Sequence, residues 1–191
     1  MAEPGIKLSQ DKISQTIDLN ELVGKDISSD ERLVTRIGQA IIDYMDQRVE
    51  NGMGLGRQRL KSPYSKEYQD SLEFKAAGKS KGHVNMRLSG DMMAAVDLLE
   101  VDGAKITYGI EDSEQAAKAY GHQTGFKGHP TLEGTGNKRE FFGITTDELK
   151  KYVLKEFEQD IKTSSASNTN QEQGLINAVR SLKTLADFFG G

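Results

Sequence analysis

One long amphipathic helix is the feature that most constrains the fold of this chain. Apolar residues recur at three- and four-residue spacing from Leu33 to Val49, which places them in one stripe along a helix. Ser28-Ser29-Asp30 supplies capping side chains before this run, and Asn51-Gly52 ends it. Because such a helix buries its stripe only against another element, we expect it to pack on a second layer.

Alternating apolar residues predict that this second layer is a small antiparallel sheet. Val84, Met86 and Leu88 alternate as in a strand. Segments 98–101 and 106–110 flank Asp102-Gly103, a favoured hairpin turn. The sequence therefore predicts a hairpin over these two segments and a further strand before it.

Two further helices are expected beyond the hairpin. Asp112 or Ser113 caps a helix over residues 114–120, which Gly121 ends. The run Thr145-Thr146-Asp147-Glu148 opens another helix, which extends to about Asp160. The predicted fold class is α+β, with long helices packed on a small antiparallel sheet and with N- and C-terminal extensions.

The remaining segments predict how the chain divides. Residues 1–27 form an N-terminal arm, in which Ile13 and Ile17, one helical turn apart, favour a short helix or a partner-bound segment. Residues 28–162 form the core, with a long exposed loop at 51–83 that holds a short helix near 65–72.

The end of the chain has the composition of a linker followed by a helix. Residues 163–173 are rich in Ser, Thr, Asn and Gln, which is typical of a polar linker. Residues 174–191 predict an amphipathic helix that either folds back on its own domain or docks on a partner. The candidate interface residues on this helix are Leu175, Val179, Leu182, Leu185, Phe188 and Phe189.

Charge is unevenly distributed along the chain, whose net charge is −4. Residues 1–50 carry −4, residues 51–87 carry +5 and residues 88–162 carry −5. A basic block therefore lies between two acidic ones, either as a solvated loop or as a contact for an acidic subunit or passing DNA. Its candidate contact residues are Arg57, Arg59 and Lys61.

The residue types give little support to catalysis. The chain has no cysteine, and Ser89 lacks the G-x-S-x-G surroundings of an activated serine. His122 and His129 flank a Gly-rich loop without a third ligand at metal-binding spacing. The run 52–56 follows a helix, whereas dinucleotide-binding loops follow a strand. We predict no enzyme activity, no catalytic residue, no metal and no cofactor.

The sequence predicts neither a secretory leader nor a membrane-spanning segment. The lack of cysteine fits a cytoplasmic protein, or at least one assembled in a reducing compartment. No apolar run approaches the roughly 20 residues that span a bilayer. Residues 1–5 have no basic region followed by an apolar one, so no secretory leader and no membrane association are expected.

Several degenerate motifs follow one another in a particular order. An aromatic segment around Tyr64 and Tyr68 precedes an apolar segment that turns through Gly90 into a helix. Later, a helix ends in His122-Gln123-Thr124-Gly125, and Arg139-Glu140-Phe141-Phe142-Gly143 then leads into the last core helix.

Over residues 32–160 this series resembles the phage virion morphogenesis (tail completion) family and related neck and minor tail proteins. In that family a His-Gln-x-Gly-like turn precedes an Arg-x-Phe-Leu-Gly-like segment. Glu140 stands where Pro is usual, and Phe142 stands where Leu is usual. The residues that match the core of the family motifs are Gly90, Tyr120, Gly125, Arg139, Phe141, Phe142 and Gly143.

The resemblance implies a structural virion protein at the head–tail junction, either a tail completion (terminator) protein or a neck component. Its expected partners are further copies of itself in a ring, with six copies implied by the family, and other neck and tail tube proteins. A head–tail adaptor of different copy number is the alternative, and a DNA-contacting binding domain is a further one.

Overall fold

Two strands open the fold and two more follow the long helix. The computed structural model describes residues 5–60, 64, 66–76, 79, 82, 84–86, 90–125 and 138–164. Its strands are β1 (Ile6–Leu8), β2 (Ile13–Asp18), β3 (Asp97–Asp102) and β4 (Lys105–Ile110). Its helices are α1 (Leu19–Val23), α2 (Glu31–Glu50), α3 (Lys66–Asp70), α4 (Leu72–Ala76), α5 (Asp91–Ala94), α6 (Ser113–Thr124) and α7 (Thr146–Glu148), and a 3₁₀ turn spans Leu55–Arg57.

The sheet is antiparallel throughout, in the order β1-β2-β4-β3. Between β2 and β4, Ile13 lies opposite Ile110 and Ile17 lies opposite Ile106. All four side chains are buried because alternate residues of a strand face the same side. The sheet and its helices confirm the predicted α+β class.

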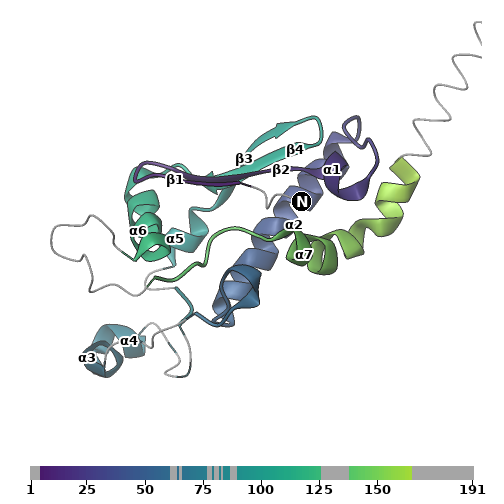
Figure 1. Ribbon diagram of the computed structural model, residues 1–191. Coiled ribbons are helices and arrows are strands. Elements are labelled where there is room, and N and C mark those ends of the chain that lie inside the picture. Colours follow the sequence, from purple (N-terminus) through teal and green to yellow (C-terminus); the bar gives the residue numbers. More distant parts are fainter. Residues whose placement is uncertain are drawn as a thin grey trace, which may run out of the picture.

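Helices cover one face of this sheet, as Figure 1 shows, with α2 running beneath the strands. The predicted amphipathic helix is confirmed, and Asp30 caps it by accepting a hydrogen bond from the N–H of Leu33. Gly38 allows the close approach of helix and sheet, since a Cβ there would lie 2.9 Å from the Leu98 side chain. Within the described residues, no helix is long and apolar enough to cross a membrane.

The prediction that residues 1–27 form an arm outside the core is wrong. β2 is an inner strand, and Ile13 and Ile17 are buried in the core on one face of it. A spacing of four residues fits one helical turn, but it also fits one face of a strand, whose side chains alternate. The hydrogen-bonded partner that decides between the two, β4, lies about 90 residues later in the chain.

The helix after the hairpin is longer than expected. Asp112 caps α6 by accepting from the N–H of Gln115, as predicted. The helix continues past Gly121 and ends at Gly125, whose φ of 77° is the left-handed conformation that a helix end favours. Gly121 is instead buried inside the helix, where its lack of a side chain suits close packing.

The last core helix begins at the predicted capping box. The Thr145 hydroxyl accepts from the N–H of Glu148, and the Glu148 carboxylate accepts from the N–H of Thr145. After α7 the helix passes through a π turn at Leu149–Val153 and a 3₁₀ turn at Leu154–Phe157, and continues to residue 164. Residues 163 and 164, the first two of the predicted linker, are helical instead. The rest of the predicted linker and the predicted terminal helix lie outside the described residues.

The segment 51–86 differs from a simple exposed loop. It contains α3 and α4 near the predicted short helix, and the Leu60 and Phe74 side chains are buried. No strand forms over residues 84–86, because Met86 has a φ of 55° that breaks an extended run. Val84 and Met86 pack into the core as loop residues.

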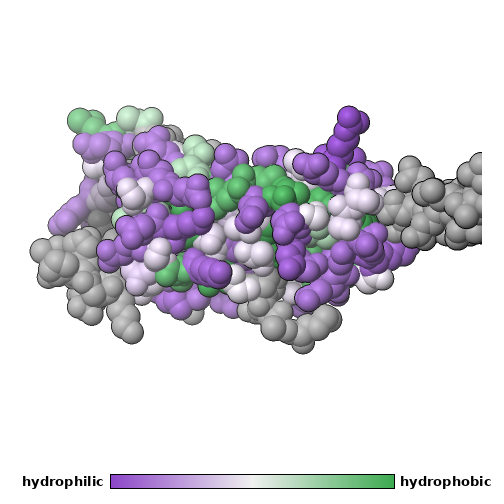
Figure 2. Space-filling view, turned by 90° about the horizontal axis from the view of Figure 1, so that it is seen from above, coloured by the Kyte–Doolittle hydropathy of each residue, from purple (hydrophilic) through white to green (hydrophobic). Residues whose placement is uncertain are grey.

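Small and polar residues lie on the outer face of the sheet where β2 pairs with β4. Thr16 and Thr107 lie opposite each other, with their hydroxyl oxygens 3.0 Å apart, and Ser14 lies opposite Gly109. Figure 2 looks down on this side of the molecule and shows a hydrophobic band across its middle, bordered by hydrophilic residues.

Candidate functional site

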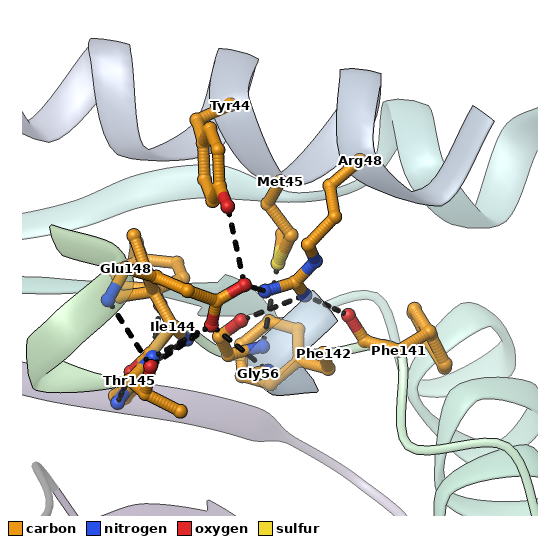
Figure 3. A network of polar contacts seen from close by, with 12 residues as sticks. Tyr44, Met45, Arg48, Gly56, Phe141, Phe142, Ile144, Thr145 and Glu148 are labelled. Carbon is orange, nitrogen blue, oxygen red and sulfur yellow. Dashed lines mark hydrogen bonds and ion pairs between the residues drawn. The ribbon is translucent and has the colours of Figure 1, made fainter. Parts of the chain in front are cut away.

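A buried arginine organises the interior next to α2. The Arg48 side chain is 0% exposed and donates from Nη1 to the Glu148 carboxylate at 3.0 Å. Its Nη2 donates to the carbonyl oxygens of Phe141, at 2.6 Å, and Gly143, at 2.9 Å. Figure 3 shows Arg48 reaching from α2 to these groups. Arg48 therefore holds segment 141–143 against the helix.

Glu148 is held as an anion in the same network. Its carboxylate accepts from the backbone N–H groups of Gly56, at 2.9 Å, and Thr145, at 3.1 Å, and from the Tyr44 hydroxyl at 3.2 Å. Burial alone would raise the pKa of Glu148, but the Arg48 charge and these N–H groups outweigh it and lower that pKa. The ion pair thus ties together α2, α7 and the turn at Gly56.

Two glutamine side chains take the place of a strand partner for segment 141–144. Gln15, on β2, donates to the carbonyl oxygen of Ile144 at 3.0 Å and accepts from its N–H at 2.9 Å. Gln123, on α6, accepts from the N–H groups of Phe141, at 3.0 Å, and Phe142, at 3.2 Å. Buried backbone groups need such partners, so this segment is stable without joining the sheet.

The joint at Gln123 connects the two segments that carry the family resemblance. The N–H of Arg139 also donates to the carbonyl oxygen of His122 at 2.8 Å. The turn that ends α6 and the segment that begins at Arg139 therefore lie side by side, although residues 126–137 separate them in the chain. We name this contact between residues 122–123 and 139–142 the motif joint.

Replacing Gln123 by Leu tests the motif joint. The substitution leaves the buried N–H of Phe142 without an acceptor, and the N–H of Phe141 keeps only the Arg139 carbonyl oxygen at 2.9 Å. We therefore expect the free energy of unfolding to fall by about 1–3 kcal/mol. Equilibrium denaturation in urea measures this loss. Gln115→Leu, in the same helix, is the control because the Gln115 side chain is partly exposed and lies outside the joint. Equal losses in the two variants would contradict the assigned role.

The other residues that match the family motifs also occupy structural positions. Phe141 and Phe142 are fully buried, and the Phe142 ring lies 5.6 Å from that of Tyr108. Tyr120 is partly buried against the core. Gly90, Gly125 and Gly143 all have positive φ, where a side chain would be strained.

Arg48, Gln15 and Glu148 were missed as a group by sequence reasoning. The one local indication for Arg48 is its place three residues after Met45 and beside Val49, on the apolar stripe of α2. For Glu148 it is the capping-box position. Nothing near Gln15 in the sequence indicates its partner, which is 129 residues away.

The structure separates Arg57 and Arg59, two of the three predicted basic contact residues. The Arg57 guanidinium lies 4.9 Å from the centre of the Tyr152 ring, which in turn stacks on Tyr44. Arg59 faces a different cleft, and Lys61 lies outside the described residues. The predicted candidate interface at residues 175–189 is also outside them.

Arg59 lines a cleft of about 210 Å³ together with Lys138 and Arg139, and we name this cleft the basic hollow. The motif joint places Lys138 and Arg139 there, about 80 residues after Arg59. The other lining residues are Gly54, Leu55, Gln58, Leu60 and Glu140.

Positive charge in and beside the basic hollow is only partly compensated. Lys138 pairs with Glu140 at 2.7 Å, whereas Arg59 and Arg139 have no ion pair in the described part of the chain. Lys79 lies 4.7 Å and Arg139 lies 5.9 Å from the centre of the Tyr64 ring. Burial, together with the charge of Arg139, lowers the pKa of Lys79 to about 8. This region suits an anionic group from outside the chain.

Of the three histidines, His122 alone lies within the described ranges. Burial and the charges of Arg139 and Lys79 lower the pKa of His122 to about 4. No group of three or more His, Asp or Glu side chains within these ranges is placed to hold a metal ion. His83, His129 and Ser89 lie outside them.

Comparison of the chain with protein-family models, with curated proteins and with solved structures finds no match. The resemblance to the tail completion family therefore rests on the sequence motifs alone and stays a prediction.

Proposed function

We propose that this chain is a structural virion protein of a tailed phage that acts at the head–tail junction, as a tail completion protein or neck component, through ring assembly. The observation that carries the proposal is the motif joint. The two most specific segments of the resemblance, 122–125 and 139–143, meet through the hydrogen bonds of Gln123 and His122.

The motif joint matters because the resemblance depends on the order and spacing of short, degenerate motifs. Two of these motifs, 122–125 and 139–143, contact each other in the fold. Here each segment supplies what the other needs: α6 provides the amide and carbonyl oxygens, and segment 139–142 provides the N–H groups. The motifs thus behave as parts of one structural unit.

In a ring, the charged surfaces of this chain act as contacts between subunits, and this role requires no catalysis. A ring subunit presents two different surfaces that pair head to tail with its neighbours. The basic hollow, in which Arg59 and Arg139 have no ion pair among the described residues, is one such surface. In this proposal the chain is assembled in the host cytoplasm, forms a ring of six copies, and contacts neck and tail tube proteins in the virion.

Mass spectrometry of particles made by the encoding phage, with electron microscopy after deletion of the gene, tests the proposal. We expect the chain in the particles at a copy number consistent with a ring. Deletion should give tails of irregular length if the chain terminates the tail, or tails separated from filled heads if it connects them. Absence from particles together with a monomeric purified chain would refute a structural role.

A head–tail adaptor with a different copy number is the alternative within the same class, and the particle stoichiometry separates the two. A DNA-contacting domain is the alternative from another class, favoured by the charge of the basic hollow. Salt-dependent binding to duplex DNA that is lost on neutralising Arg57, Arg59 and Lys61 would support that second reading.

A further inference from the structure

A row of carboxylates runs along the edge strand β3. Asp97, Glu100 and Asp102 are exposed and lie opposite Gly109, Thr107 and Lys105 of β4, with a bulge after Leu98. The bulge keeps all three on the outer side of the sheet, away from the helices. None of the three has an ion pair within the described residues. We name these three residues the acidic row.

The acidic row and the basic hollow lie toward opposite ends of α2. The β3–β4 turn lies beside Ser28, just before α2 begins, since a Cβ on Gly103 would lie 3.3 Å from the Ser28 Cβ. Gly54 of the basic hollow comes shortly after α2 ends. A helix of 20 residues is roughly 30 Å long, so Asp102 is too far away to neutralise the hollow of its own chain.

We infer that the basic hollow of one copy receives the acidic row of a second copy. The inference rests on the proposed ring assembly and names the contact that forms the ring. Arg59 of the basic hollow and the three carboxylates of the acidic row are exposed, have no ion pair within the described residues, and are opposite in sign. Two different patches toward opposite ends of a subunit make a head-to-tail contact, which closes into a ring when the rotation between copies allows it.

The position of β3 at the edge of the sheet, in addition to its charges, favours a second copy of the chain as the occupant of the basic hollow. β3 is an edge strand of the sheet, and its three carboxylate residues are exposed, so within the described residues they can reach a neighbour without any rearrangement of the sheet. Arg59 and Arg139 each present a planar guanidinium, which binds carboxylates through two parallel hydrogen bonds.

A competing role for the acidic row predicts the opposite result. Charged residues and bulges on an edge strand commonly prevent it from pairing with other strands. If that were the only role of the acidic row, removing its charge would strengthen self-association. If the acidic row docks in the basic hollow, removing its charge weakens self-association.

Charge reversal on each surface, followed by sedimentation velocity at 50 and 500 mM NaCl, tests the inference. We expect the full chain to self-associate at low salt and less so at high salt, because salt screens exposed ion pairs. Arg59→Glu and Glu100→Lys should each weaken association by about tenfold, since like charges then face each other. The double variant should restore it.

Glu114→Lys is the matched control, because Glu114 is exposed but lies outside the acidic row, and it should leave association unchanged. A wild-type chain that stays monomeric at low salt would overturn the inference, as would Glu100→Lys with unchanged or stronger association. A double variant no better than the single variants would also overturn it. A third outcome is that Arg59→Glu abolishes binding to DNA while Glu100→Lys has no effect on self-association. The basic hollow would then bind the phosphate groups of DNA and not the acidic row. Mass spectrometry of the particles tests the proposed function independently, so a failure of this contact and a failure of the proposed function can be told apart.

Discussion

Replacing Arg48 by Met is expected to lower the free energy of unfolding by about 3–5 kcal/mol, the usual cost of removing one partner of a buried ion pair. Met fills much of the same space, so the loss comes from the polar groups that remain. The Glu148 carboxylate, 4% exposed, loses its cation, and the carbonyl oxygens of Phe141 and Gly143 lose their donor. Equilibrium denaturation in urea, followed by circular dichroism, measures the change.

Arg36→Met provides the matched control on the same helix. Arg36 pairs with Asp160 at 2.9 Å, nearly the distance of the Arg48–Glu148 pair, but its side chain is 63% exposed. An exposed pair contributes about 1 kcal/mol or less. We also expect Glu148→Gln to recover part of the loss in the Arg48→Met background, because it removes the orphaned charge and keeps an acceptor for Thr145. Equal losses for Arg36→Met and Arg48→Met would show that burial does not matter here.

Elements with local determinants could be predicted from the sequence. The stripe of α2, the Asp102-Gly103 turn and the Thr145 capping box each depend on residues within a few positions of one another. The preferences that form them act before the rest of the chain is in place. These three features, found in the structure as expected, place most of the helical layer and half of the sheet.

Elements decided by distant partners could not be predicted in the same way. Ile13 and Ile17 fit a helix or a strand equally well until β4 pairs with them. The same holds for the polar interior. Arg48 and Gln15 look like ordinary polar residues, and their role appears only when segment 141–144, about 100 residues later, lies against them. The charge of residues 51–87 was enough to predict Arg59 as a contact residue. The basic hollow could not be predicted, because Lys138 and Arg139 also line it and reach it only through the motif joint.

Replacing Gly109 by Ala is expected to destabilise the sheet strongly, although the substitution adds a single methyl group. A Cβ at this position would lie 2.0 Å from the carbonyl oxygen of Ile13 and 2.9 Å from the Cα of Ser14. Both atoms belong to the backbone of β2, so no side chain can move to relieve the clash. The inner strands β2 and β4 must separate locally, and we expect a loss of about 3 kcal/mol, the upper end of what overpacking costs.

Two other glycines separate this clash from effects of backbone conformation. A Cβ on Gly24 meets no atom within 4 Å, but its φ of +67° strains any other residue, so Gly24→Ala should cost about 1 kcal/mol. A Cβ on Gly5 meets no atom within 4 Å and has no positive φ, so Gly5→Ala should change stability by about 0.5 kcal/mol or less. Urea denaturation should therefore rank the losses as Gly109, then Gly24, then Gly5. If Gly109→Ala cost no more than Gly24→Ala, the close contact of β4 with the β2 backbone would not be what requires a glycine at this position.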